Sequence, residues 1–252
     1  MKKTPLFTPL LLPLLLLAAC SDAPQPIRQL RAQSLSYGDL SYRIYHYDDK
    51  NRISSITTGL VNEGDSANFT NHIRYDGDKI DKFEITDQAI IDYIYDGDKI
   101  RETREYLSGV LIAIHHYTHD THGRVITWEI ERIRFEGEEP VPDNKYTYDY
   151  NADGNLITQQ AYVFQESEYR LLHTITYEDF DDKKNSDILF LTDLYNFQHI
   201  KFKNNPRTWR LVNAGSGATA EEHFQFEYNE QGYVTRSIPA QGSGIIYRFS
   251  EF

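Results

Sequence analysis

The chain has 252 residues, and its 38 Asp and Glu residues outnumber the 26 Lys and Arg residues, which gives a net charge of -12 at pH 7. Proteins bind nucleic acid through clustered Lys and Arg, whereas the basic residues here are scattered among acids, so nucleic acid is not expected as a partner. The chain has a single cysteine, which excludes an internal disulfide bond.

The first predicted element is a lipoprotein signal peptide over residues 1–20. Lys2 and Lys3 form its basic start, Leu6–Leu17 its apolar part, and Leu17-Ala18-Ala19-Cys20 resembles a lipobox. The apolar run is shorter than the roughly 20 residues that a membrane-spanning helix needs. We therefore expect cleavage before Cys20, lipidation of Cys20 and anchoring to a membrane through that lipid. Cleavage removes two lysines and leaves a mature chain with a charge of about -14.

The next predicted elements are a flexible tether over residues 21–38, which contains Pro24 and Pro26, and a single domain over residues 39–252. An anchor of this kind implies that the protein is located in the cell envelope. We expect an outer-membrane lipoprotein that is either periplasmic or exposed at the cell surface. The sequence does not determine on which side of the outer membrane the protein lies.

The domain contains a repeated segment in which aromatic or β-branched residues alternate with polar residues and end on Tyr. An Asp, Asn or Gly turn follows, and then a basic or polar residue and Ile, Leu or Val. The copies are residues 44–53, 72–80, 92–100, 115–125, 147–156 and 226–234, with a decayed copy at 174–184. Each copy predicts one hairpin, because Asp, Asn and Gly tolerate tight turns and Tyr, Ile and Val favour strands.

Alternation along these strands predicts which face is buried. Tyr146, Tyr148 and Tyr150 share one face and are expected in the core, whereas intervening positions such as Thr147 are polar and are expected in water. The predicted fold class is all-β, an antiparallel meander of repeated hairpins that curls into a strongly curved sheet or open barrel. Residues 178–202 fit this pattern least, and either a short helix or a further repeat near 197–202 is expected there.

The repeated turns, with Gly123-Arg124-Val125 as the copy that keeps a Gly-Arg pair, resemble YD (RHS-type) repeats. A lipobox followed by such repeats resembles an uncharacterised family of bacterial surface lipoproteins with a porin-like fold. This resemblance implies a curved antiparallel sheet or barrel and no established activity.

Two clusters have ligand types that bind metals. Asp149, Asn151 and Asp153 match the first half of a calcium-binding EF-hand loop, but Gln160 takes the place of its final bidentate carboxylate, so a hairpin turn is the preferred interpretation.

His119 and His122 form the best pair in a histidine-rich stretch that could bind zinc, although a solvated loop is preferred because no dedicated spacing motif is present. No cofactor is predicted.

No catalytic constellation was recognised, and most aromatic residues are explained by burial. Trp128 and Trp209 are the candidate binding residues if they lie at an exposed surface. The preferred hypothesis is a non-enzymatic binding or scaffold module for a glycan, peptide or protein. The alternative is a hydrolase that uses two facing carboxylates on an envelope or dietary polymer.

Overall fold

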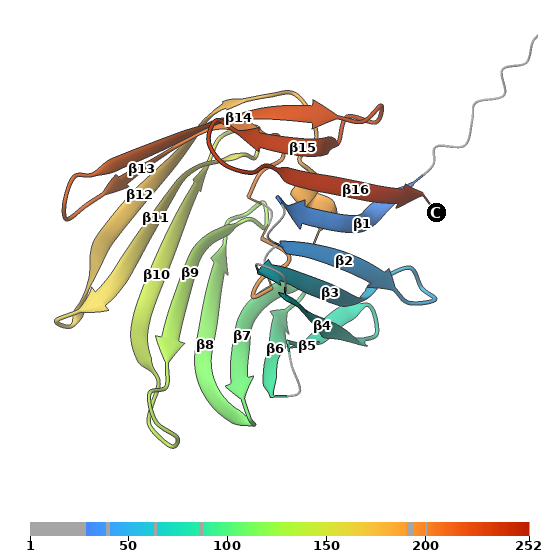
Figure 1. Cartoon of the computed structure of the whole chain (residues 1–252). Helices are drawn as coiled ribbons and strands as arrows, with labels where there is room; N and C mark the ends of the chain where they lie inside the picture. The colour runs from blue at the N-terminus through green and yellow to red at the C-terminus, as the bar shows by residue number, and fades with distance from the viewer. Residues whose placement is uncertain are drawn as a thin grey trace, which may run out of the picture.

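The computed structural model describes residues 29–38, 41–62, 65–85, 88–190, 194–199 and 201–251, and only the backbone of residues 61, 62, 65 and 66. This part of the chain forms a closed barrel of sixteen antiparallel strands (Figure 1), in which each strand pairs with its chain neighbours and β1 pairs with β16. The strands are β1 (Leu30–Tyr37), β2 (Ser41–Tyr47), β3 (Ile53–Asn62), β4 (Asp65–Asp76), β5 (Lys79–Glu84), β6 (Ala89–Asp96), β7 (Lys99–Leu107), β8 (Val110–His119), β9 (Val125–Arg132), β10 (Val141–Tyr150), β11 (Leu156–Gln165), β12 (Glu168–Phe180), β13 (Pro206–Asn213), β14 (Thr219–Tyr228), β15 (Val234–Pro239) and β16 (Ile245–Glu251).

The all-β meander predicted from the repeats is confirmed, and two details are corrected. The sheet closes into a barrel and is not open, because β1 bridges β2 and β16. The strand that closes it, Leu30–Tyr37, lies within residues 21–38, which were predicted to be a tether. The prolines of that stretch precede β1. Ala32 and Leu35 of β1 are both buried in the core, with a shift in strand register between them, so the domain begins earlier than expected. Residues 1–28, including Cys20, lie outside the described residues.

Residues 178–202 contain no further hairpin among the residues described there. Within the described residues the one helix is a 3-10 turn, η1 (Ser186–Leu189), which partly matches the expected short helix. No helix in the described part of the chain is long and apolar enough to cross a membrane.

The repeated turns gather at one end of the barrel, which we call the tyrosine end. In the turn between β8 and β9, Oδ1 of Asp120 accepts hydrogen bonds from the backbone N–H groups of His122 and Arg124, both at 2.9 Å. Gly123 takes the left-handed conformation in this turn, with φ 83°. Three other turns of this end use the same Asp or Asn position, and these residues are Asp48, Asn151 and Asn229.

The terminal tyrosine of a repeat joins its strand to the preceding one. The hydroxyl groups of Tyr47, Tyr75, Tyr95 and Tyr150 donate to backbone carbonyl groups at 2.7, 2.9, 2.8 and 2.9 Å, respectively. A basic residue of the preceding strand or turn lies over each of these rings. In the same order, these residues are Arg31, Arg52, Lys79 and Arg124, and their cationic groups lie 4.4, 4.0, 5.2 and 4.8 Å from the ring centroids. The Tyr and the basic residue of the sequence repeat therefore act together as an inter-strand clamp.

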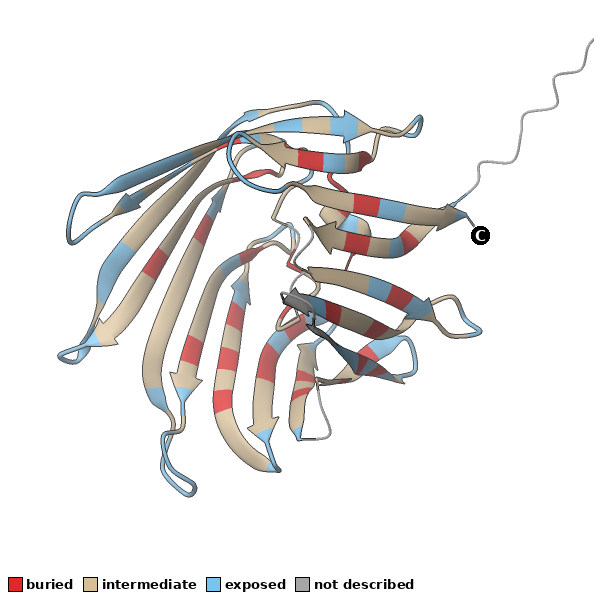
Figure 2. Ribbon diagram, in the orientation of Figure 1, coloured by how far each residue is buried: buried red, intermediate tan, exposed pale blue. Residues whose placement is uncertain are grey.

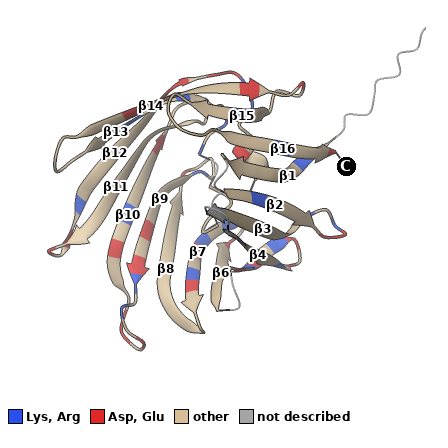
Figure 3. Ribbon diagram, viewed as in Figure 1, with Lys and Arg blue, Asp and Glu red and all other residues tan. Residues whose placement is uncertain are grey.

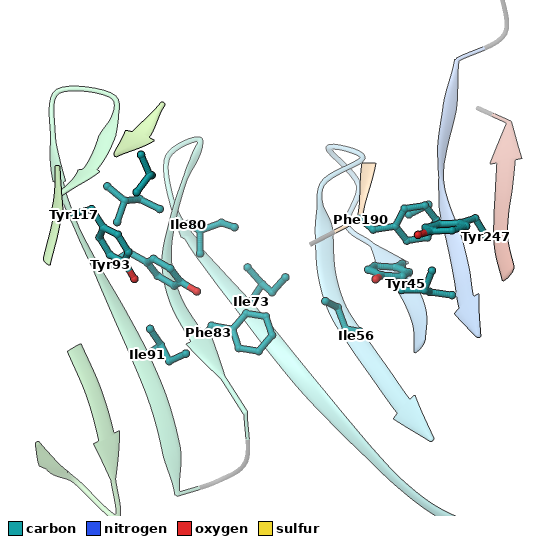
Figure 4. Packing of buried hydrophobic residues seen from close by; sticks show 14 of the residues in the cluster. Tyr45, Ile56, Ile73, Ile80, Phe83, Ile91, Tyr93, Tyr117, Phe190 and Tyr247 are labelled. Carbon is teal, nitrogen blue, oxygen red and sulfur yellow. The ribbon is translucent and has the colours of Figure 1, made fainter. Parts of the chain in front are cut away.

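The inward-facing positions form the core. Ile91, Tyr93 and Tyr148 are buried, as the alternation predicted, and buried positions recur at intervals along the strands (Figure 2). Figure 4 shows two parts of this core, one around Tyr93 and one in which Tyr45 and Tyr247 lie beside Phe190. The barrel interior is thus lined mainly by aromatic and aliphatic side chains.

Charged residues lie along many of the strands (Figure 3). Asp92 lies between the buried residues Ile91 and Tyr93, so alternation points its side chain outward, where it pairs with Lys82 at 3.0 Å. Further ion pairs on this barrel are Arg74–Glu84, Arg104–Glu102, Lys145–Glu129, Arg210–Glu221 and Arg236–Glu227, and His116 of β8 lies 3.4 Å from Glu131 of β9. Because these pairs occur from β4 to β10 and from β13 to β15, most of the circumference has a polar outer wall.

Candidate functional site

The candidate site lies inside the barrel, against the connection between β12 and β13. This connection, residues 181–205, is called the lumenal segment, and its described residues are 181–190, 194–199 and 201–205. It leaves β12 and re-enters β13 at the tyrosine end, and Figure 1 shows it in orange within the ring of strands. Its rings pack on inward-facing residues from separate strands: Phe190 on Tyr45 and Tyr247, Phe197 on Tyr93, His199 on Tyr148 and Phe202 on Tyr177.

Hydrogen bonds fix the lumenal segment to several hairpin turns. Oδ1 of the buried Asn155 accepts from the backbone N–H groups of Lys203 and Asn204 at 2.8 and 2.7 Å, and its Nδ2 donates to Oδ1 of Asn204 at 3.1 Å. Gln198 bridges β7 and its turn, since its Oε1 accepts from the backbone N–H of Ile100 at 2.8 Å and its Nε2 donates to the carbonyl of Asp98 at 2.7 Å. The segment is therefore a fixed internal plug.

A cavity of about 650 Å³, partly open to solvent, lies between this segment and the barrel wall. Its volume falls within the range of roughly 300 to 1,000 Å³ that is typical of small-molecule sites. The wall contributes Arg43, Trp128 and Tyr177. The lumenal segment contributes the other lining residues, which are Asp187, Ile188, Phe190, Leu194, Tyr195, Phe197, His199, Lys201 and Phe202.

Stacked rings form one side of the cavity. The ring of Tyr195 lies on His115, with centroids 4.5 Å apart, and Trp128 lies beside Tyr146 at 5.0 Å. Trp128 also donates its Nε1–H to Nδ1 of His115 at 3.0 Å, which fixes the orientation of the indole. This side of the cavity can therefore pack against a flat or apolar ligand surface.

The described lining of the cavity contains more cationic than anionic side chains. Asp187 is the only carboxylate among the described lining residues, and it accepts a hydrogen bond from the hydroxyl of Tyr247 at 3.2 Å. Burial raises the pKa of Asp187, and the Tyr247 hydrogen bond and the charge of Lys201 offset this rise only in part. Arg43 and Lys201 bring two cationic groups to the same cavity.

The structure separates the two candidate binding tryptophans. Trp128 lines the cavity, whereas Trp209 is half-buried in β13, opposite Tyr177 of β12 and Glu222 of β14, and is not among the described lining residues.

The candidate metal ligands do not converge. His119 lies beside Lys99 in a smaller pocket, and burial together with the charges of Lys99 and His199 lowers the pKa of His119. His122 is exposed in the adjacent turn, with Nδ1 3.8 Å from Oδ2 of Asp120.

Asn151 is a turn residue whose Oδ1 accepts from the backbone N–H of Asn155 at 2.9 Å. Asp149 faces outward on β10, and Asp153 is exposed at the turn, so the three EF-hand-like positions form part of a hairpin. Across the described residues, no group of three or more His, Cys, Asp or Glu residues could hold a metal ion.

Sequence reasoning missed Arg43, Asp187 and Lys201. Asp187 and Lys201 belong to a stretch that lacks strand alternation, and Arg43 is an inward-facing charge on a strand whose other inward residues are Tyr. The signal that could have found the site is the aromatic-rich stretch of residues 181–205, which interrupts the repeats over about the distance between two successive copies.

The fold and the site define a closed antiparallel barrel with an internal segment that fills one end and leaves a ligand-sized cavity. No protein-family model matches the chain, and no curated protein sequence matches it either. A solved structure described as a porin-like protein from Bacteroides vulgatus ATCC 8482 is 12% identical, with a TM-score of 0.59 over 88% of this chain and 99% of that chain. A second, a porin-like protein from Bacteroides uniformis ATCC 8492, is 10% identical, with a TM-score of 0.55 over 88% of this chain and 95% of that chain. At these identities the likeness shows the fold alone, and the porin-like fold expected from the sequence resemblance is confirmed at that level.

Proposed function

We propose that this chain is a lipid-anchored protein of the cell envelope whose barrel stands in water and binds a small ligand in the lumenal cavity. The observation that carries the proposal is the aromatic-walled cavity of about 650 Å³ between the barrel wall and the lumenal segment. The sequence left a glycan, a peptide or a protein open as the ligand. The cavity volume favours a short glycan, or another small molecule, over a protein surface.

The outer wall supports a barrel in water. Membrane-spanning barrels present an apolar band outward and a polar interior, and a Lys or Arg on the lipid face costs about 2 to 4 kcal/mol at the bilayer midplane. This barrel has the reverse arrangement, with ion pairs such as Lys82–Asp92 and Lys145–Glu129 outside and buried aromatic residues inside. Membrane attachment is therefore assigned to the lipid on Cys20.

The lumenal segment supports a binding role over a channel. Barrels of sixteen to eighteen strands leave an aqueous channel when their interior is unfilled. Here the packed rings of the segment and its hydrogen bonds to Asn155 and to Ile100 fill the tyrosine end. The cavity that remains is a pocket with a fixed floor.

A carboxylate-dependent hydrolase is less well supported. Hydrolysis of a glycosidic bond by that route uses two carboxyl groups roughly 5 to 9.5 Å apart. Asp187 supplies the only carboxylate in the described lining of the cavity. One carboxyl group in the described lining does not supply the pair that this chemistry needs.

The two tryptophans provide a test of ligand binding. In Trp209→Phe protein the remaining Trp128 reports on the cavity, and in Trp128→Phe protein the remaining Trp209 reports on the barrel wall. Screening of small molecules and short glycans should find compounds that change the fluorescence of the first variant in a saturable way and raise its Tm. Fluorescence changes of equal size in both variants would contradict a ligand site in this cavity.

The attachment is tested with Cys20→Ser in the full chain. If the lipid alone holds the protein to the membrane, this variant should leave the membrane fraction while its folded barrel keeps the same Tm. Retention of folded Cys20→Ser protein in membranes washed with high salt would show that the barrel itself is embedded.

A further inference from the structure

The cavity contains cationic groups that the barrel does not neutralise. The chain as a whole is strongly acidic, and most of the basic side chains of the outer wall have an acidic partner, such as Arg104 with Glu102 at 2.6 Å. Arg43 and Lys201 differ from these, because the structure pairs neither of them with a carboxylate among the described residues. Cations left unpaired at an internal surface are costly to a fold unless they serve a ligand.

Arg43 is the more constrained of the two. It lies on the inward face of β2, and Nη1 of its guanidinium is buried without a hydrogen-bond partner among the described residues. Its guanidinium lies over the ring of Tyr37, 6.0 Å from the centroid. Two residues along the same face, the hydroxyl of Tyr45 is also buried, and the charge of Arg43 lies beside it. Burial raises the pKa of Tyr45, so that hydroxyl stays protonated and remains a hydrogen-bond donor.

Lys201 reaches the cavity from the lumenal segment. Its backbone carbonyl accepts from the N–H of Leu156 at 2.8 Å, which fixes the position of the residue in the barrel. The only acid in the described lining is Asp187, which accepts a hydrogen bond from Tyr247, so one carboxyl group faces the two cationic side chains of Arg43 and Lys201. The positive charge in the cavity is therefore available to a ligand.

The other lining residues indicate the chemistry of the rest of the ligand. Trp128, Tyr195, Phe197 and Phe202 present ring faces and edges, and Leu194 adds aliphatic surface. Such a wall binds a flat or apolar body by area burial and stacking. A sugar without a charge would leave the two cations unused, and a small inorganic anion would leave the rings unused.

We infer that the lumenal cavity binds an organic anion, in which a carboxylate, sulfonate or phosphate group is held by Arg43 and Lys201 and an aromatic or apolar body packs against the rings around Trp128. This inference rests on the proposed function and names the class of ligand. The anionic group takes the donors of Arg43 and Lys201, and the apolar body takes the stacked side formed by Trp128 and Tyr195.

Two dyes with the same ring system distinguish the contribution of the ligand's charge to binding from the contribution of its shape. Anilinonaphthalene sulfonate carries one anionic group, and phenylnaphthylamine has the same aromatic rings without it. Each is titrated into full-length Trp209→Phe protein, with energy transfer from Trp128 as the readout. We expect the sulfonate dye to bind more tightly than the neutral dye, and Arg43→Gln or Lys201→Gln to weaken it roughly tenfold or more, as the loss of a charged hydrogen bond would. The same substitutions should change the affinity for the neutral dye by less than about twofold, since uncharged rings make no ion pair.

Matched controls remove a charge outside the cavity. Lys203→Gln changes an exposed lysine two residues along the lumenal segment, and Arg248→Gln changes an exposed arginine on β16. Neither should alter the affinity for either dye. A structural role for Arg43 would lower the Tm of Arg43→Gln, whereas a binding role leaves the Tm unchanged or raises it, because an unpaired buried cation is removed.

The outcomes separate the inference from the function on which it rests. If Trp128 senses both dyes but Arg43→Gln and Lys201→Gln leave the sulfonate dye unaffected, or weaken both dyes equally, the anion site is wrong and the binding cavity stands. If folded protein transfers no energy from Trp128 to either dye, the binding cavity itself is wrong.

Discussion

The two ends of the barrel are built differently. At the tyrosine end, the hydroxyl of the last tyrosine donates to the preceding strand in four hairpins, and a cation covers each of these rings. At the opposite end, the described turns share no such pattern. Two of them are tight, with positive φ at Ser108 and Gly109 and at Glu166 and Ser167, whereas the connection from β9 to β10 is longer and exposes Phe135.

This difference indicates that the two ends of the barrel have separate roles. The lumenal segment leaves and re-enters the wall at the tyrosine end, so the repeated clamps hold both the closed barrel and the floor of the cavity. The turns of the opposite end carry no part of that floor in the described structure and are free to vary, as surface loops that carry recognition commonly do. We therefore expect substitutions at the tyrosine end to affect stability and substitutions at the opposite end to leave it unchanged.

The greatest loss is expected at Asn155. Asn155→Ala removes the acceptor for the backbone N–H groups of Lys203 and Asn204 and leaves both donors without that partner inside the barrel. The unfolding free energy should fall by roughly 2 to 4 kcal/mol, because each unsatisfied buried donor costs about 1 to 3 kcal/mol. Urea unfolding measures this, with the exposed Asp153→Ala of the same turn as the control. Equal losses in the two variants would mean that the lumenal segment is not anchored through Asn155.

A smaller loss is expected from one tyrosine clamp. Tyr75→Phe keeps the ring under Arg52 but removes the hydrogen bond from the hydroxyl to the carbonyl of Ile53 at 2.9 Å. We expect a loss of about 1 kcal/mol, the usual net value of one hydrogen bond. The control is Tyr162→Phe on β11, whose hydroxyl donates only to the side chain of Gln160 at 3.0 Å and which should change stability by less than about 0.5 kcal/mol. Tm measurements on both proteins decide whether the clamp contributes to the fold.

Asp120 in a tyrosine-end turn and Asp187 in the lumen should show opposite pH dependence. Although burial raises the pKa of Asp120, hydrogen bonds from Arg124 and His122 lower it to about 2, from an ordinary value of 3.8. Its charge therefore stabilises the fold above pH 3.8, and this contribution is lost as the pH falls toward 2. Burial raises the pKa of Asp187, so ionising it costs stability as the pH rises above 3.8.

Asp→Asn variants at the two positions test this contrast. Asp120→Asn should lower the Tm at pH 7 and lose its effect as the pH approaches 2. Asp187→Asn should raise the Tm at pH 7 and lose its effect below pH 3.8. Thermal melts across this pH range measure both trends, and parallel pH curves for the two variants would contradict the assignment of opposite environments.

The sequence predicted the tyrosine end well, because its chemistry is local. A turn such as Asp120-Thr121-His122-Gly123-Arg124 contains its own acceptor, its left-handed residue and the arginine that pairs back with Asp120. Alternation then fixes which side of each strand is buried, and Tyr148 and Tyr93 lie inside as expected. Strand order in a meander follows from chain order, so little tertiary information was needed.

The closure and the cavity depend on contacts between distant residues. Closure pairs Leu35 with Tyr247, and neither strand carries a turn that would reveal the pairing. The cavity combines Arg43 of β2 with Lys201 of the lumenal segment, which no local pattern relates. Trp128 was a candidate because of its residue type, on the condition that it lies at an exposed surface, and the structure places it in the cavity wall. The fold could thus be predicted from the periodicity of the sequence, whereas the site could be found only from the geometry of the closed barrel.

The smallest effect is expected at Phe135, where the comparison of the two ends is most direct. Its side chain is 71% exposed in the connection from β9 to β10, so Phe135→Ser removes little buried area and should change the unfolding free energy by less than about 0.5 kcal/mol. If this connection takes part in recognition at the mouth of the cavity, the same variant should weaken ligand binding while its Tm stays constant. A clear fall in Tm would instead show that the opposite end also holds the barrel together, and the division of tasks between the two ends would have to be abandoned.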